Sequence, residues 1–246
     1  MAIKAQLFST CLSERFFPGT LERLVTLLER LGVVVDYPES QTCCGQPQYN
    51  SGFRNDARDM ARQWLKVFAS LEGYIVSPSA SCVHMVRNKY PDLFPPDTPE
   101  YRRALDVAER TFEFIEFLTR VLKVTDVGAR FPHKVTYHAS CHLLRELNLR
   151  EEPKQLLMAV RDLELIPLSG EEVCCGFGGI FSVVYPEVSR TMVQAKVEDI
   201  MATGAEVVVA GDAGCLMNIA GGLKKAGSSI KVMHVVDVLA SNGGVQ

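Results

Sequence analysis

Short apolar runs alternate along the first half of the chain with stretches of helical periodicity. The β-rich run AIKAQLFST (2–10) is followed by apolar residues spaced three and four apart, namely Leu21, Leu24, Val25, Leu28 and Leu31. The runs VVVDYP (33–38) and YIVSPS (74–79) predict two more strands, with a helix at about 54–72 between them. Strands that alternate with helices of this length predict βαβ units, a parallel sheet and right-handed crossovers.

The same order of elements recurs in the second half. Strands are predicted at HKVTYHAS (133–140), LELIPL (163–168) and EVVVAGD (206–212), with a helix at about 187–203 and a final strand at IKVMHVVDVL (230–239). We therefore expect an α/β fold made of two duplicated, small, open parallel-sheet layers related by pseudo-two-fold symmetry.

A proline-rich segment separates the halves. PDLFPPDTP (91–99) predicts a linker without regular structure, and apolar residues such as Phe112, Ile115 and Phe117 predict a helix from about Glu100 to Val124. The expected division is a first cysteine-rich repeat at 1–90, a linker with a connecting helix at 91–130, and a second cysteine-rich repeat at 131–246.

All eight cysteines follow the duplication. The tripeptide Cys-Cys-Gly occurs in QTCCGQ (41–46) and again in EEVCCGFGG (171–179), and a single cysteine lies on either side of each copy. The matched cysteines are offset by 130 to 133 residues, and the two sets are Cys11, Cys43, Cys44 and Cys82, then Cys141, Cys174, Cys175 and Cys215.

Each cysteine follows a predicted strand and precedes a helix. The carboxyl ends of parallel strands share one sheet edge, where ligands bind in open α/β folds, so each set of four can converge there. Four thiolates suit either a tetrahedral zinc site or an iron–sulfur cluster. Gly45 and Gly176 would let the backbone turn with positive φ and approach the metal closely.

Histidines accompany the cysteines. His138 and His142 flank Cys141, and His84 follows Cys82. They are expected to act as hydrogen-bonding neighbours of the metal ligands, with direct ligation as the alternative.

Composition and charge limit the binding partners and the cellular compartment that we expect. The formal net charge of −3 gives no basic surface for nucleic acid or an anionic membrane. The first residues, MAIKAQLFSTCLSERFF, lack the apolar core of a signal peptide, and no run of about 18 apolar residues predicts a membrane span. We expect a cytoplasmic protein, in which clustered cysteines bind metal or do redox work more often than they form disulfides.

The repeated cysteine pattern, together with YHASCHLLREL (137–147) and CCGFGGIFSV (174–183), resembles the cysteine-rich CCG domain family. That family includes the cysteine-rich subunit of heterodisulfide reductase, the iron–sulfur subunit of glycolate oxidase and the lactate utilization proteins, and the similarity covers nearly the whole chain. It implies that both sets of four cysteines are cluster motifs, binding one or two 4Fe-4S clusters or zinc at one site.

The resemblance also implies a function. The chain would be an iron–sulfur electron-transfer subunit that oxidises L-lactate to pyruvate together with a ferredoxin-type iron–sulfur protein and a third lactate-utilization subunit. No catalytic residue is assigned. The final Cys-x-x-Cys of the heterodisulfide reductase motif is missing, because Met85 and Asn218 occupy the last position. A zinc-stabilised assembly subunit and a thiol-based redox catalyst remain the alternatives.

Overall fold

The structure is a computed structural model that describes residues 2–242, and the chain divides into two compact units, Met1–Phe117 and Leu118–Gln246. The first unit contains a four-stranded sheet of order β2-β1-β3-β4, in which every neighbouring pair is parallel. Its strands are β1 (Lys4–Leu7), β2 (Val34–Asp36), β3 (Tyr74–Ser77) and β4 (Thr111–Glu113).

The second unit repeats this topology. Its sheet has the order β6-β5-β7-β8, again with parallel neighbours only. The strands are β5 (Lys134–His138), β6 (Glu164–Ile166), β7 (Val207–Ala210) and β8 (Lys231–His234). Two parallel sheets with equivalent strand orders confirm the predicted duplicated α/β fold.

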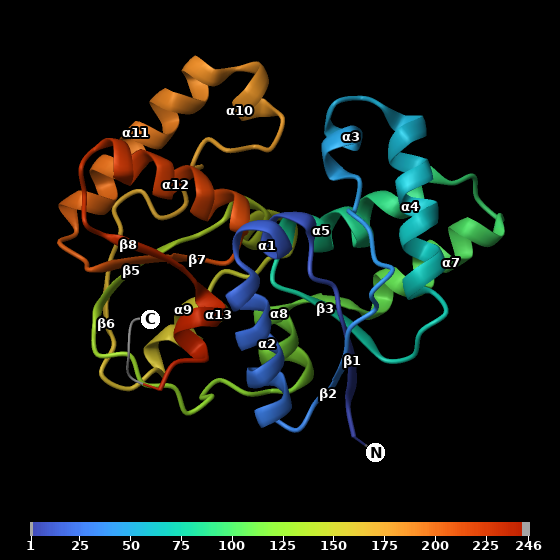
Figure 1. Cartoon of the computed structure of the whole chain (residues 1–246), viewed down its shortest axis with the longest axis horizontal. Coiled ribbons are helices and arrows are strands. Elements are labelled where there is room, and N and C mark those ends of the chain that lie inside the picture. The colour runs from blue at the N-terminus through green and yellow to red at the C-terminus, as the bar shows by residue number, and fades with distance from the viewer. Residues whose placement is uncertain (1, 243–246) are drawn as a thin grey trace. The chain divides into compact units, whose positions relative to one another are not determined.

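Helices cover both faces of each sheet. In the first unit, α4 and α7 pack together on one face and α2 lies on the other; in the second, α11 and α12 lie on one face and α9 and α13 on the other (Figure 1). The first unit's helices are α1 (Cys11–Phe16), α2 (Pro18–Arg30), α3 (Gln46–Asn50), α4 (Arg54–Phe68), α5 (Ala80–His84), the π-helix η1 (Met85–Lys89), α6 (Tyr90–Leu93), α7 (Pro99–Arg110) and α8 (Phe114–Glu116). The remaining helices are η2 (Phe117–Val121), η3 (His142–Glu146), α9 (Glu152–Met158), α10 (Phe181–Val184), α11 (Pro186–Ala202), α12 (Ala213–Lys225) and α13 (Val235–Leu239).

The predicted helix from Glu100 to Val124 is wrong as a continuous element. Helix α7 ends at Arg110, and the next three residues form β4, which pairs with β3. Thr111 is β-branched and fully buried, and ladder bonds to a neighbouring strand outweigh the helical spacing of the apolar residues. Ile115 and Phe117 belong to the core, in two short helices, whereas Phe112 is half-buried in β4.

The proline-rich segment is more regular than predicted. Pro91 lies in the first turn of α6, and Pro99 begins α7. Proline fits there because the first amides of a helix need no partner within the helix. Thr98 caps α7 by accepting a hydrogen bond from the Tyr101 amide at 3.2 Å.

The predicted last strand, 230–239, is too long. Strand β8 ends at His234, and α13 begins immediately after it. His234 Nδ1 accepts a hydrogen bond from the Val236 amide, and the Asp237 carboxylate accepts one from the His234 amide, both at 3.1 Å. This reciprocal capping turns an apolar run into a helix start.

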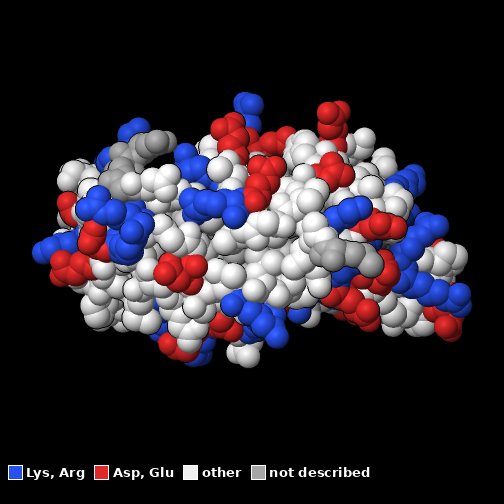
Figure 2. Space-filling model, turned by 90° about the horizontal axis from the view of Figure 1, so that it is seen from below, with Lys and Arg blue, Asp and Glu red and all other residues white. Residues whose placement is uncertain are grey.

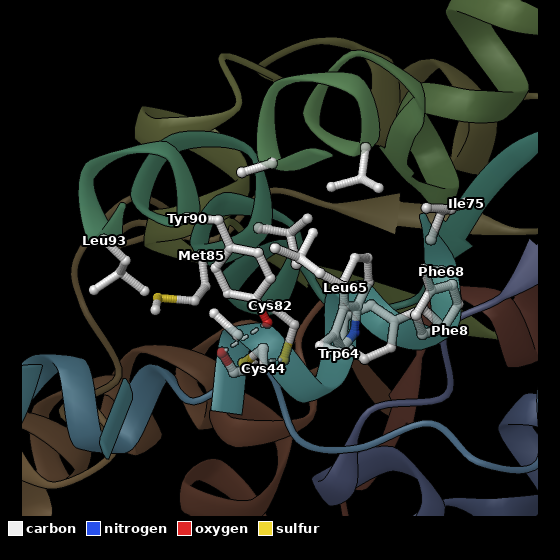
Figure 3. Close-up of a cluster of buried hydrophobic side chains, with 14 of the residues drawn as sticks. Phe8, Cys44, Trp64, Leu65, Phe68, Ile75, Cys82, Met85, Tyr90 and Leu93 are labelled. Atoms are coloured by element: carbon white, nitrogen blue, oxygen red, sulfur yellow. Dashed lines mark hydrogen bonds between the residues drawn. The ribbon is translucent and has the colours of Figure 1, made fainter. Parts of the chain in front are cut away.

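The core of the first unit is aromatic beside the cysteines. The rings of Trp64 and Phe68 stack with centroids 4.2 Å apart, and Phe8 packs edge-on to Trp64 at 5.3 Å. Tyr90 also meets Trp64 edge-on, at 5.5 Å. Figure 3 shows Cys44 at the border of this cluster, so the aromatic residues form one wall of the cysteine site.

The surface has no single dominant charge on the face shown in Figure 2, where acidic and basic side chains are interspersed. This agrees with the small net charge of −3. Within the part of the chain that the structure describes, no helix has the length and apolar character needed to cross a bilayer.

Candidate metal centres

The sheet topology places the cysteines at equivalent edges. In the first unit, the connection from β1 leads to one side, towards β2, and the later connections lead to the other, towards β3 and β4. The carboxyl ends of β1 and β3 therefore flank a topological switch point, the usual ligand-binding position in such sheets. Cys11 begins the helix after β1, and Cys82 lies in the helix after β3.

The four cysteines of the first unit come together as predicted. The Cys11 thiol donates a hydrogen bond to the Cys43 sulfur at 3.6 Å, and the Cys44 thiol donates to the Cys82 sulfur at 3.5 Å. Cys11 is exposed, Cys43 is half-buried, and Cys44 and Cys82 are buried. The site thus reaches from the core to the surface, with all four thiols free.

Hydrogen bonds within this set concentrate negative charge on one sulfur. The hydrogen bond from Cys11, the neighbouring Cys44 thiol and the backbone amides of Gly45 and Cys44 lower the pKa of Cys43 to about 3 against the opposing effect of burial. Cys11 and Cys44 show the opposite shift. Hydrogen bonding with Cys43 and burial raise the pKa values of both thiols. The set therefore offers a thiolate at neutral pH, the form that binds metals.

The second unit assembles its four cysteines in the same way. Cys141, which follows β5, and Cys174 shift each other's pKa, and so do Cys174 and Cys175, and Cys175 and Cys215, as expected for neighbouring thiols. The Gly176 amide donates to the Cys174 sulfur at 3.4 Å. Cys175 and Cys215 are buried, whereas Cys141 and Cys174 are half-buried.

Two sulfurs of the second set have lowered pKa values. Hydrogen bonds from Cys141 and Cys175 lower the pKa of Cys174 to about 2. Interaction with Cys175 and with His138 lowers the pKa of Cys215 to about 6, while burial opposes the shift. The proton-donating sulfurs, Cys141 and Cys175, have raised pKa values.

The histidines lie in different surroundings. His138, at the end of β5, is fully buried, and its ligand atom lies within 4.8 Å of the Cys175 and Cys215 sulfurs, forming a group that could hold a metal ion. His142 Nδ1 lies 3.7 Å from the Cys141 sulfur. His84 is buried at the end of α5. The roles of His138 and His142 at a metal stay predictions.

The two predicted glycines adopt the positive φ that their turns require, 78° at Gly45 and 85° at Gly176. A Cβ at Gly176 would lie 2.8 Å from the Met192 Cβ and from the Ser189 carbonyl oxygen. A Cβ at Gly45 would lie 3.2 Å from the Met60 Cβ. Each glycine thus lets its loop pack closely against the helix that follows.

Residues that the spacing did not indicate hold the Cys-Cys loops in place. The Tyr90 hydroxyl donates to the Cys44 carbonyl at 3.1 Å, and Asn218 Nδ2 donates to the Cys175 carbonyl at 2.8 Å. Lys196 is fully buried in α11, and its ammonium donates to the Gly170 carbonyl. Only Lys196 had a signal in the sequence, as a charged residue among apolar positions of a predicted helix.

The donor sets fit a metal centre. The sulfur separations of 3.5 and 3.6 Å in the first set approach the edge of about 3.8 Å expected for a tetrahedron with metal–sulfur bonds of about 2.3 Å. Thiolates are equally the usual ligands of iron–sulfur clusters, so the residues fit either group.

Comparison with known proteins supports the repeat. The cysteine-rich domain family named CCG matches residues 5–87 and 135–220. Among solved structures, a hypothetical protein from Helicobacter pylori has a TM-score of 0.61 at 10% identity, covering 96% of this chain. This chain spans about half of that protein (48%), and the likeness shows the fold alone.

Curated relatives match along nearly their entire length. Lactate utilization protein A of an Exiguobacterium species is 50% identical over 98% of this chain and 97% of its own length. The protein of that name from Oceanobacillus iheyensis is 43% identical over 99% of this chain and 100% of its own length. The chain therefore belongs to the lactate utilization protein A family, and its two repeats are cysteine-rich domains of the CCG type.

Proposed function

We propose that the chain is an iron–sulfur electron-transfer subunit of a multi-protein system that oxidises L-lactate to pyruvate. The names of its relatives support a role in lactate utilization, and the convergence of four free thiols at a topological switch point in each unit supports the chemistry. The second observation carries the proposal, because those cysteines lie far apart in the sequence and meet only at the sheet edge.

The oxidation of lactate to pyruvate releases two electrons and two protons. A 4Fe-4S cluster supplies reversible one-electron transfer when bound. The chain lacks a dinucleotide-binding glycine motif after its first strand. The proposed role is therefore to pass electrons on from a lactate-oxidising partner, in the cytoplasm, with a ferredoxin-type iron–sulfur protein and a third subunit as partners.

The chain's own residues would ligate and insulate the group. Cys11, Cys43, Cys44 and Cys82 would hold it in the first unit. Trp64 and Tyr90 exclude water on the core side, while the exposed side near Cys11 leaves a short path to a partner. Amides that donate to sulfur, such as that of Gly176, would stabilise the reduced form and so raise its potential.

The test is the metal content of protein purified without oxygen. Roughly four irons and four sulfides per site are expected in the wild type, with one site lost in Cys43→Ser and the other in Cys174→Ser. These two variants are matched controls for each other, because the residues occupy equivalent places in the two repeats. Protein that binds neither iron nor sulfide after anaerobic reconstitution would refute the proposal.

A zinc-stabilised assembly subunit is the second candidate. It is favoured by sulfur separations close to those of a tetrahedral site and by the imidazole beside Cys175 and Cys215. The same analysis separates the two candidates, since zinc without sulfide at both sites would favour the assembly role.

A thiol-based redox catalyst is the third candidate, favoured by the lowered pKa values of Cys43 and Cys174. It predicts a thiol that still reacts rapidly with an alkylating reagent in metal-loaded protein. Protection of all the thiols by the metal would exclude it.

A further inference from the structure

The two repeats differ at a matched position beside their cysteines. Phe8 comes three residues before Cys11, and His138 comes three residues before Cys141. Strand pairing fixes the match, because Leu7 pairs with Val76 at the end of β1 just as Tyr137 pairs with Val209 in β5. Phe8 and His138 thus follow equivalent strand positions, and both are fully buried.

A second matched pair lies on the following helices. The loop glycine packs against Met60 in the first repeat and against Met192 in the second. Trp64 and Lys196 each lie four residues beyond that methionine, in α4 and α11. The aromatic wall of the first site, Phe8 with Trp64, is therefore replaced by an imidazole and an ammonium group at the second.

His138 is poorly explained as a core residue. Neither buried ring nitrogen makes a hydrogen bond of normal geometry to another described residue, and the polar neighbour of the ring is the Cys215 sulfur, whose pKa His138 helps to lower. A buried polar group without a partner costs about 1–3 kcal/mol, and the duplicated sequence shows that phenylalanine can occupy this position. The Cys175 and Cys215 sulfurs lie within 4.8 Å of its ligand atom.

We propose that His138 supplies a nitrogen ligand to the metal centre of the second repeat, beside the thiolates of Cys175 and Cys215. One of Cys141 and Cys174 provides the third sulfur ligand, so that His138 takes the place of one thiolate, whereas the first repeat has a ligand set made of thiolates only. Metal coordination would satisfy one of the two buried ring nitrogens. This inference rests on the proposed metal binding but not on the identity of the metal.

A mixed ligand set has a functional consequence. Neutral imidazole in place of thiolate leaves a metal centre with less negative charge, and histidine ligation raises the reduction potential of iron–sulfur centres. Lys196 lies near the same sulfurs: burial lowers its pKa, while the charges of Asp199 and then of Cys175, Cys215 and Cys174 favour its positively charged form. If both sites hold clusters, the cluster of the second repeat is the more oxidising one.

X-ray absorption at the metal edge tests the ligand directly. Full-length Cys44→Ser protein, which keeps only the second site, is loaded anaerobically with zinc alone and separately with iron and sulfide. With zinc, one nitrogen at about 2.0–2.1 Å is expected beside sulfurs at about 2.3 Å. The matched variant Cys175→Ser, which keeps only the first site, should show sulfur alone. A shell of sulfur alone in Cys44→Ser protein would overturn the proposal.

His138→Phe provides the second measurement, because it installs the residue of the first repeat. The wild-type first site stays intact in this variant and reports on folding through its own metal. The nitrogen contribution should disappear, and the affinity of the second site for zinc should fall by about 10-fold or more, while the first site binds as before. Unchanged affinity and an unchanged absorption spectrum would also overturn the proposal.

The outcomes separate this inference from the proposed function. Nitrogen at the second site with zinc, but no iron or sulfide at either site, would leave His138 as a ligand and refute the electron-transfer role. Iron and sulfide at both sites, with no nitrogen ligand at the second, would support the electron-transfer role and refute His138 as a ligand.

Discussion

The two repeats place four cysteines at the same edge of equivalent sheets but surround them differently. In the first, Phe8 and Trp64 pack against the site. In the second, His138 and Lys196 take those places, and Cys215 gains a lowered pKa of about 6 to which His138 contributes. Duplication thus kept the geometry of the thiols, while changes in the walls allow the two sites different charge and different ligands.

The largest expected difference between the two cysteine sites is in how much their wall residues, Trp64 and Lys196, stabilise the folded protein. Trp64→Ala should lower the free energy of unfolding by about 3–5 kcal/mol, because it leaves a cavity among stacked rings. Lys196→Ala should cost less, because removing a buried ammonium also removes its burial penalty. Denaturant unfolding of metal-free protein measures both. Equal losses would show that Lys196 is as essential to its unit as Trp64.

The next largest losses of stability are expected at the glycines of the two Cys-Cys-Gly loops, Gly45 and Gly176. Gly176→Ala should destabilise by about 2–4 kcal/mol, from the strained positive φ and from overpacking of a Cβ 2.8 Å from Met192 and Ser189. Gly45→Ala should cost about 1–2 kcal/mol, mainly from its φ, since the Met60 Cβ is 3.2 Å away. Thermal unfolding of both variants checks the order, and a larger loss for Gly45→Ala would contradict it.

Smaller losses of stability are expected from the residues that hold the Cys-Cys loops, which differ between the two repeats. Tyr90→Phe removes the donor to the Cys44 carbonyl, and Asn218→Met removes the donor to the Cys175 carbonyl. The second substitution installs the residue of the first repeat, Met85. Each change should cost about 1 kcal/mol.

The metal affinity of each site provides a second measurement on the Tyr90→Phe and Asn218→Met variants. Each substitution should weaken binding only at the site in its own repeat, as measured by zinc competition against a chromogenic chelator. A loss at both sites after either substitution would show that the repeats are coupled.

The sequence predicted the features that the two repeats share, but it did not predict features that depend on tertiary contacts. The cysteine offsets indicated the duplicated fold and the two convergent sets, because the order of strands and helices alone brings those loops to one edge. Strand β4 was not predicted, because Thr111 is recruited by pairing with β3, a tertiary contact that local periodicity does not encode. Likewise, nothing in the spacing reveals that Tyr90 and Asn218 anchor equivalent carbonyls from different helical positions.

The smallest expected effect concerns the entry to β7. Glu206 accepts a hydrogen bond from the Lys134 amide at 2.8 Å, which lowers its pKa below the ordinary 4.5, with His133 contributing. In the first repeat the matched residue is Gly73, which precedes β3 and has no carboxylate.

A carboxyl group with a lowered pKa binds its proton more weakly in the folded than in the unfolded chain. The stability that Glu206 contributes is therefore complete above about pH 4.5 and is lost as the pH falls through the lower folded-state value. Glu206→Gln should be less stable than the wild type at neutral pH and should approach it as the pH falls below that value in urea unfolding. His133→Ala, which keeps the amide bond, should show a weaker pH dependence of the same sign. A Glu206→Gln deficit that does not change with pH would mean that the carboxylate charge adds nothing, and that the two strand entries differ only in backbone conformation.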